Sequence, residues 1–185
     1  AVLPFLGFWM YGLFDLDEGF YASITAEMVR RGDLITPYFN GKPWFEKPIL
    51  LYWISYPFVW FGQNALAARL SSVLCALALI GVVRAVVGRR FSHLAGDTAG
   101  LVLASSLLFL GVGRMMMTDA AFVLAFSLCA LWAWEPDTRK WAGVALGLSI
   151  LAKGPVGVLL FVGLMVFAAW RLPEFRRRIK GGWAA

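Results

Sequence analysis

The stretch Ala65-Leu-Ala-Ala-Arg-Leu-Ser-Ser-Val-Leu-Cys-Ala-Leu-Ala-Leu-Ile-Gly-Val-Val83 indicates which class of protein this chain belongs to. A helix needs about 20 apolar residues to cross the hydrocarbon core of a bilayer, and this run approaches that length with one charge, Arg69. Hydrophobic residues make up 61% of the chain and the mean hydropathy is +0.73, whereas soluble domains average about 45–50% apolar residues. Four further apolar runs follow, at 98–113, 115–134, 141–152 and 155–170. The sequence therefore predicts an all-α, polytopic membrane protein.

Both ends of the chain look like parts of longer apolar segments. The chain starts with Ala1, and its first apolar run has neither the basic start nor the cleavage site of a signal peptide. We interpret residues 1–14 as the end of a first span and the final Gly-Gly-Trp-Ala-Ala as the start of another apolar segment. The sequence is thus expected to be an N-terminal fragment that forms a single transmembrane domain.

The basic residues predict which joints between spans share a side of the membrane. The chain has 17 basic residues, and ten of them fall in three joints: Arg84, Arg89 and Arg90; Arg139 and Lys140; Arg171, Arg176, Arg177, Arg178 and Lys180. The positive-inside rule places these joints in the cytoplasm. The layout then has spans at 65–87, 96–113, 115–134, 141–152 and 155–170, with a basic cytoplasmic loop at 171–182. The segment 15–62, the corner at 113–119 and the break at 153–155 face the periplasm.

This layout depends on the aromatic segment Ile49–Gly62. If the segment crossed the membrane, the joint at 84–90 would move outside and the charge rule would weaken. Its short length and its Tyr, Trp and Phe residues favour a helix in the membrane interface.

The periplasmic segment also shows local signals. Asp17 can cap a helix that begins at Glu18 and ends at Arg31, with Gly32 as its stop. Phe20, Ile24 and Met28 share one stripe, which predicts a helix lying on the membrane surface, while Glu27 can pair with Arg31. Asn40-Gly41 predicts a tight turn.

The apolar stretch from Trp141 to Trp170 is broken by Lys153-Gly154-Pro155. A helix of this length would span about 45 Å, which is too long for one crossing. Gly followed by Pro is typical of one helix ending and the next beginning. We therefore expect a helical hairpin whose tip presents Lys153 to a cavity.

Charged residues inside apolar runs are costly and are candidates for function. Lys153, Asp119 and Arg114 qualify, and all three lie near predicted outer ends. The alternatives are snorkelling or a structural ion pair between Arg114 and Asp119, and Arg69 is equally compatible with a structural role.

Two acidic sites precede the spans. Asp17 and Glu18 can serve as helix-cap and first-turn acids, or as a general base and a metal site shared with Glu46. Glu46-Lys47-Pro48 places an acid and a base at a rigid point, which is either a juxtamembrane ion pair or a phosphate contact. Carboxylates combined with Lys and Arg at one face suit a phosphate-bearing lipid substrate.

Several other classes of function lack their motifs here. The chain has no Ser/His pairing of a hydrolase, no CxxC and no phosphate-binding glycine loop. It also has no basic stripe with interleaved aromatic residues, so nucleic acid is not an expected partner.

An ordered set of motifs resembles the first outer loop of a membrane glycosyltransferase family. The set comprises Asp17-Glu18-x-x-Tyr21-Ala22, Met28-x-x-x-Gly32-Asp33, Thr36-Pro37, Gly41-Lys42-Pro43 and Phe45-Glu46-Lys47-Pro48-x-Leu50-x-Tyr52-Trp53. Arg114 with Asp119, and Leu151-Ala-Lys-Gly-Pro-Val-Gly157, are similar to later segments of this family. The family is glycosyltransferase family 39, of GT-C fold, which includes protein O-mannosyltransferases and the lipid A 4-amino-4-deoxy-L-arabinose transferases. The Phe-Glu-Lys-Pro element resembles the arabinose-transferase branch.

The resemblance implies an inverting hexosyl- or pentosyltransferase of the bacterial inner membrane. Such an enzyme takes a sugar from a polyprenyl-phosphate carrier and transfers it to lipid A (lipopolysaccharide), another glycan or a protein on the periplasmic side. By resemblance, the candidate catalytic residues are Asp17, Glu18 as its partner acid, and Asp119. The candidate ligands of the carrier phosphate are Lys47, Lys153 and Arg114; Glu46 is a candidate ligand of a divalent metal (Zn, Mg or Mn), and Tyr21 and Tyr52 are expected in the substrate cavity.

One position departs from the arabinose-transferase pattern. That branch often has Pro-Arg after the acid pair, where this chain has Gly19-Phe20, so the resemblance leaves the sugar open. The alternative function is a transporter or flippase of a lipid-linked substrate, because intramembrane charges and broken helices also mark transport sites. A non-catalytic assembly subunit is a third alternative.

Overall fold

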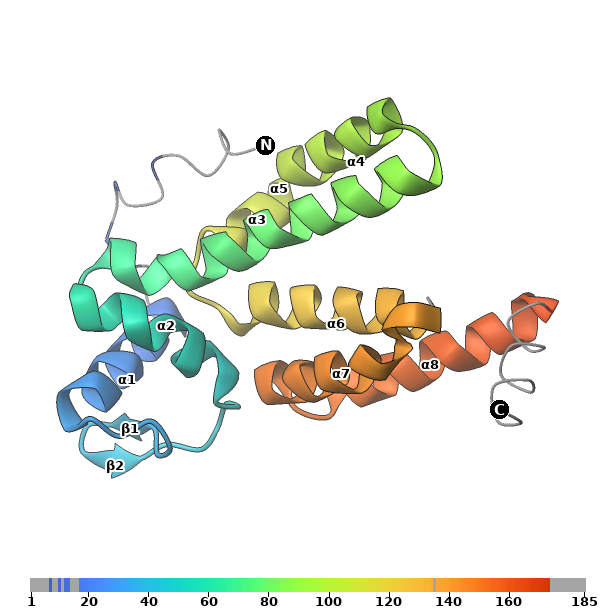
Figure 1. Cartoon of the computed structure of the whole chain (residues 1–185). Helices are drawn as coiled ribbons and strands as arrows, with labels where there is room; N and C mark the ends of the chain where they lie inside the picture. The colour runs from blue at the N-terminus through green and yellow to red at the C-terminus, as the bar shows by residue number, and fades with distance from the viewer. Residues whose placement is uncertain (1–6, 8–9, 11, 14–16, 135, 174–185) are drawn as a thin grey trace.

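The computed structural model describes residues 7, 10, 12–13, 17–134 and 136–173. This part contains eight α-helices and one small β-hairpin, which lies at the edge of the fold beside α1 (Figure 1). The segment before the apolar runs forms α1 (Asp17–Arg31), β1 (Tyr38–Phe39), β2 (Lys42–Pro43) and α2 (Leu50–Phe61). The apolar runs form α3 (Ala65–Arg90), α4 (His93–Ser105), α5 (Leu107–Gly113) and α6 (Thr118–Trp134). A short 3-10 turn, η2 (Pro136–Thr138), leads to α7 (Arg139–Lys153) and α8 (Val156–Arg171). Asp15 and the basic residues at 176–180 lie outside the described residues.

Three local signals in the segment before α3 are confirmed, whereas Asp17 is the first residue of α1 rather than its cap. Helix α1 ends at Arg31, followed by Gly32 at φ 66°, and Glu27 pairs with Arg31 at 2.7 Å. Asn40 and Gly41 both have positive φ and connect β1 to β2, as a two-residue hairpin turn requires. Helix α7 ends at Gly154, whose φ of 69° lets the chain reverse into α8 and form the predicted hairpin.

The predicted membrane-surface position of the α1 stripe is wrong. Ile24 and Met28 are fully buried, and they pack with Leu51 and Tyr52 of α2. Phe20 stacks on Phe39 of the β-hairpin, with ring centroids 4.3 Å apart. The stripe therefore buries its apolar area against protein and fastens α1 to α2 and to the hairpin.

The segment of the predicted span at 96–113 contains a bend that was not predicted from the sequence. Helices α4 and α5 are bent by 69° at Ser106, whose backbone is extended at φ −64° and ψ 121°. The Ser106 amide bonds to Leu103 and so closes α4 after Ser105. Packing against α3 sets the direction of α4. The two helices lie so close together that a Cβ at Gly96 would meet Gly88 Cα at 2.8 Å.

The described helices differ in length and in apolar character. One described helix, Ala65–Arg90, is long and apolar enough to cross a membrane, and the bent pair α4 and α5 makes a second if counted together. Helices α2, α6 and α8 are apolar but shorter.

The two ends of the helix bundle contain different elements and joints (Figure 1). Helix α1, the β-hairpin, α2, the corner between α5 and α6 and the tip between α7 and α8 gather at one end. The joints that contain Arg89-Arg90 and Arg139-Lys140, and the end of α8 at Arg171, lie at the other end. The structure thus groups the described joints as the basic residues predict, and the end that contains α1 holds the candidate site.

Candidate functional site

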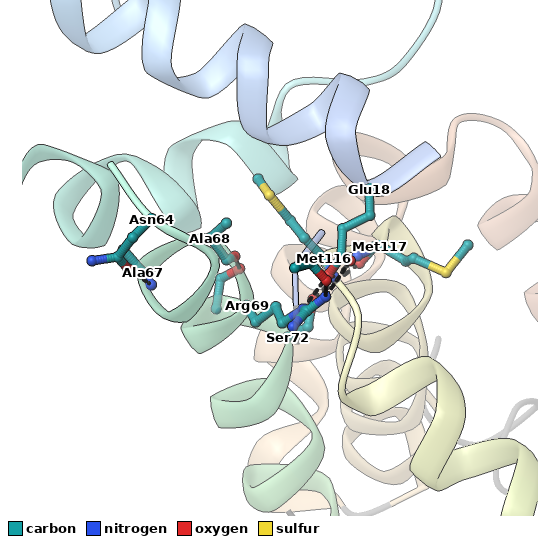
Figure 2. Close-up of polar contacts among 10 residues, drawn as sticks. Glu18, Asn64, Ala67, Ala68, Arg69, Ser72, Met116 and Met117 are labelled. Carbon is teal, nitrogen blue, oxygen red and sulfur yellow. Dashed lines mark hydrogen bonds and ion pairs between the residues drawn. The ribbon is translucent and has the colours of Figure 1, made fainter. Parts of the chain in front are cut away.

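A buried ion pair joins the start of α1 to α3 (Figure 2). Arg69 donates to the two carboxylate oxygens of Glu18, from Nε at 2.6 Å and from Nη2 at 2.7 Å. The Met116 amide donates to Glu18 Oε1 at 2.9 Å, and Arg69 Nη2 also donates to the Gly12 carbonyl at 2.7 Å. Both side chains are 0% exposed. We call Glu18, Arg69 and Met116 the buried hub.

The hub corrects the prediction that Glu18 is a catalytic acid. A substrate cannot touch this carboxylate because it is fully buried and accepts hydrogen bonds at both oxygens. Ionised groups are buried only when they are paired and hydrogen-bonded. Glu18 instead locks the first turn of α1, and hence Asp17, to α3 and to the corner before α6. Glu18 and Arg69 are 51 residues apart in sequence. The one feature of the sequence that indicates their pairing is an Arg early in an apolar run, because such an Arg needs an acid as its buried partner.

Asp17 is exposed at the first turn of α1, directly beside the hub. Burial raises the pKa of Tyr21, and the negative charges of Asp17 and Asp119 raise it further. Two carboxylates that are far apart in sequence therefore lie near one phenol.

Tyr21 and Tyr52 lie in the core beneath this region. Their rings meet edge to face at 6.4 Å, and Tyr52 is fully buried. Burial also raises the pKa of Tyr52, with smaller contributions from Tyr21 and from the charge of Glu46. Neither tyrosine lines the cleft described next, so a place for them in a substrate cavity stays a prediction.

A cleft of about 440 Å³ opens between the segment before α2 and the tip of the α7–α8 hairpin. Its walls are Phe45, Glu46, Lys47, Pro48, Thr118, Ala152, Lys153, Gly154 and Pro155. It brings together Glu46-Lys47 and Lys153, which are more than a hundred residues apart in sequence. A hydrophobic cluster next to the cleft holds α2, α6 and α7 together. It includes Leu50, Ala121 and Ala152.

The charges of the cleft are only partly balanced. Lys153 donates to Asp119, and both side chains are partly exposed, at 40% and 33%. Within the described residues, Glu46 and Lys47 form no ion pair with each other or with another side chain. The cleft therefore offers the Lys47 ammonium, which has no described ionic partner, and the Lys153 ammonium, whose charge Asp119 partly neutralises. Such a pair of cations suits an anion that enters the cleft from outside the protein.

Arg114 is not brought into this cleft. It follows α5, and its guanidinium lies within 3.9 Å of the position that a Cβ on Gly7 would take. The alternative ion pair between Arg114 and Asp119 is wrong, because Asp119 pairs with Lys153. A contact from Arg114 to carrier phosphate stays a prediction.

The donor set around Glu46 does not fit a metal ion. Among residues 17–134 and 136–173, no group of three or more His, Cys, Asp or Glu side chains is placed to hold one. Glu46 has Lys47 and Lys153 as its charged neighbours in the cleft, and Asp119 is taken by Lys153.

A solved structure of a membrane protein is similar to this fold. ArnT from Cupriavidus metallidurans bound to undecaprenyl phosphate matches with a TM-score of 0.80 and 30% identity, over 94% of this chain and 35% of that one. The similarity confirms the predicted all-α fold of a GT-C-type membrane glycosyltransferase.

Two relatives are similar to this chain in sequence. An uncharacterized protein of Aquifex aeolicus is 36% identical over 89% of this chain and 39% of its own length. The undecaprenyl phosphate-alpha-4-amino-4-deoxy-L-arabinose arabinosyl transferase of Photorhabdus laumondii is 32% identical, over 83% of this chain and 30% of its own. This chain thus spans about a third of the length of these relatives.

A family model completes the comparison. The model described as dolichyl-phosphate-mannose-protein mannosyltransferase matches residues 46–184, which include every wall of the cleft except Phe45, helices α3 to α8 and most of the chain. The chain therefore belongs to the dolichyl-phosphate-mannose-protein mannosyltransferase family of membrane glycosyltransferases.

Proposed function

We propose that this protein transfers a sugar from a polyprenyl-phosphate carrier to an acceptor at the periplasmic face of the bacterial inner membrane. The observation behind the proposal is the cleft that brings Lys47 and Lys153 together beside Asp119, at the same end as Asp17. The similarity to ArnT bound to undecaprenyl phosphate supports a lipid-linked donor. Lipid A is the first acceptor to test, and another glycan or a protein are the others.

The cleft is the proposed seat of the carrier phosphate. Lys47 supplies an ammonium that no described side chain neutralises, and Lys153 supplies a second one that is paired with Asp119. The phosphate gains negative charge as it departs, so fixed cations at this point stabilise the transition state more than the bound donor. Asp119 holds Lys153 in position before the donor binds.

Asp17 is the proposed contact for the acceptor. In direct transfer with inversion, the acceptor oxygen forms a bond to the anomeric carbon as the bond from that carbon to the phosphate oxygen breaks. An acceptor hydroxyl would pass its proton to the Asp17 carboxylate, whereas a lipid A phosphate is already anionic and needs only to be positioned. The buried hub fixes the first turn of α1 and so fixes the backbone position from which the Asp17 side chain extends.

The sugar is the least determined part of the proposal. Aminoarabinose is the first candidate because relatives with 32% and 33% identity are named for its transfer. Phe20 stands where that branch often has Arg, and it packs on Phe39 and Trp44 as an anchor of the hairpin. A pentose and a hexose therefore both need testing.

A divalent metal stays a prediction from the family resemblance. The described residues do not supply a ligand set for it, so no step above depends on one. The grouping of the charges at one end of the bundle also favours a transferase over a transporter, whose site would lie near the membrane midplane.

The test uses the full-length protein in a strain that lacks its gene. Mass spectrometry of lipid A, of other envelope glycans and of envelope proteins should reveal one sugar that returns with the wild-type gene. Asp17→Asn should abolish its return, with the same amount of folded protein in the membrane. Asp33→Asn, the same change at a partly exposed residue beyond α1, is the matched control. Transfer that is unimpaired in Asp17→Asn would refute the role of Asp17, and no gene-dependent sugar on any acceptor would refute the proposed function.

A further inference from the structure

One polar wall of the cleft has no role in the scheme above. Thr118 begins α6 and lines the cleft between Lys153 and the Glu46-Lys47 segment. The residue is 7% exposed, and its hydroxyl makes no hydrogen bond in the part of the chain that the structure describes. The hydroxyl oxygen is not fully enclosed, and because Thr118 lines the cleft, this oxygen can meet a ligand there.

Thr118 is also the first residue of α6. The two preceding amides are already used, because Met116 donates to Glu18 and Met117 donates to Ser72 Oγ at 3.3 Å. The first amides of a helix such as α6 have no carbonyl within the helix to accept from them. The positive end of the helix dipole therefore adjoins the cleft at Thr118.

The charge balance of the cleft explains why a neutral donor is useful there. Glu46 adds a negative charge to the same walls, and Asp119 offsets part of the charge of Lys153. Lys47 alone supplies a cation that no described side chain neutralises. A phosphate in this cleft needs further donors that bring no opposing charge, and a hydroxyl at a helix N-terminus is such a donor.

We propose that the Thr118 hydroxyl donates a hydrogen bond to the carrier phosphate and so forms its binding site together with Lys47 and Lys153. The inference rests on the proposed function and adds a residue that neither the family motifs nor the charge pattern single out. The departing polyprenyl phosphate bears more negative charge than the phosphodiester of the donor. Thr118 therefore binds the product at least as strongly as the donor.

A purely structural role for Thr118 makes different predictions. As a cap of α6, Thr would be replaced well by Asp, because acids are favourable at helix N-termini. As a phosphate donor, Thr would be replaced badly by Asp, because a carboxylate repels the phosphate and has no proton to donate at neutral pH. Ser satisfies both roles, and Val, which has nearly the same shape, satisfies neither.

The experiment measures binding of undecaprenyl phosphate to the full-length protein in phosphatidylcholine nanodiscs, with thermal unfolding recorded for each variant. Thr118→Val should weaken binding about tenfold or more, the effect of losing one hydrogen bond to a charged group. Thr118→Ser should stay within about threefold of wild type, and Thr118→Asp should lose binding while its unfolding temperature is maintained. Thr98→Val, the same change at a hydroxyl that bonds to Leu94 in α4, should bind as wild type does.

The outcomes separate this inference from the proposed function. If Thr118→Val binds normally while Lys47→Gln does not, the inference is overturned and the carrier-phosphate site stands. If Thr118→Asp binds as well as Thr118→Ser, the hydroxyl is a cap and the inference is also overturned. If the wild-type protein does not bind undecaprenyl phosphate at all, the proposed function fails and this inference fails with it.

Discussion

Two charged regions lie at the same end of this molecule, and they are built in opposite ways. In the hub, Glu18 and Arg69 are fully buried and bond to each other and to backbone groups. In the cleft, Lys153 and Asp119 are partly exposed, and Lys47 has no ionic partner in the described chain. The hub has nothing left to offer a ligand, whereas the cleft has unused donors and an open side.

The difference shows how to assign roles to charges in an apolar chain. A charge that is buried and fully bonded positions the backbone, and its removal should affect stability first. A charge that is half exposed and incompletely paired is available to a substrate, and its removal should affect binding first. Three of the four changes below concern the hub or the cleft, and the fourth concerns a carboxylate outside both regions.

The largest expected effect is the loss of Arg69. Arg69→Met leaves the Glu18 carboxylate buried without its ion-pair partner, which should cost about 3–5 kcal/mol of stability. Thermal unfolding of the full-length protein in detergent would show this as a large fall in unfolding temperature. The double variant Glu18→Leu/Arg69→Met should regain much of the loss because no buried charge remains.

The matched control for Arg69 is Arg84→Met. Arg84 pairs with Asp97, but both side chains are well exposed, at 65% and 48%, so the pair should contribute less than about 1 kcal/mol. Equal destabilisation by the two substitutions would contradict the assignment of a structural hub.

The second effect concerns the hairpin that presents Lys153. A Cβ on Gly157 would meet Ser149 Oγ at 2.3 Å and Ser149 Cβ at 3.1 Å, whereas a Cβ on Gly163 meets nothing within 4 Å. Gly157→Ala should therefore force α7 and α8 apart, at a cost of about 1–3 kcal/mol, and should also weaken carrier binding. Gly163→Ala in the same helix should be neutral or slightly stabilising.

Removing the opposing oxygen checks this steric explanation. The double variant Gly157→Ala/Ser149→Ala should recover part of the unfolding temperature, because the closest contact is gone. If Gly157→Ala and Gly163→Ala unfold alike, close packing of the hairpin does not position the tip.

The third effect is on binding alone. Lys47→Gln should weaken undecaprenyl phosphate binding about tenfold, near 1.4 kcal/mol, and should leave the unfolding temperature unchanged because Lys47 has no described ionic partner. Lys42→Gln, at an exposed position in β2, is the control for a general loss of positive charge. Similar losses in both variants would indicate nonspecific attraction rather than a site.

The smallest effect is at a carboxylate that belongs to neither region. Hydrogen bonds from the Thr36 and Ile35 amides hold the pKa of Asp33 below its usual value. A lowered pKa adds stability at pH above the ordinary value of about 4, and this contribution is lost as the pH falls through the lowered pKa. Asp33→Asn should therefore change stability slightly at neutral pH and less in acid, as paired unfolding curves would show. A larger effect of the substitution in acid than at neutral pH would contradict this.

The elements predicted well from sequence are those set by neighbours in the chain. Helix α1, its stop at Gly32 and the Asn40-Gly41 turn depend on capping and on positive φ, which are local. The break at Gly154 and the grouping of the basic joints are also local in origin, because they follow from single residues and their order. The bend at Ser106 was missed because apolar composition alone does not distinguish one straight helix from two bent ones.

The sequence by itself determined that this is a helical membrane chain, where its reversals occur and which charged residues gather at one end. Only the tertiary structure decided what those charges do. Glu18 and Asp17 are neighbours, yet one is sealed against Arg69 and the other is exposed. Asp119 could pair with Arg114 by sequence, but the packing of α6 on α7 gives it Lys153. The reason is physical: the burial and partners of a charge depend on contacts across 34 to 98 residues, and these contacts exist only once the helices have packed.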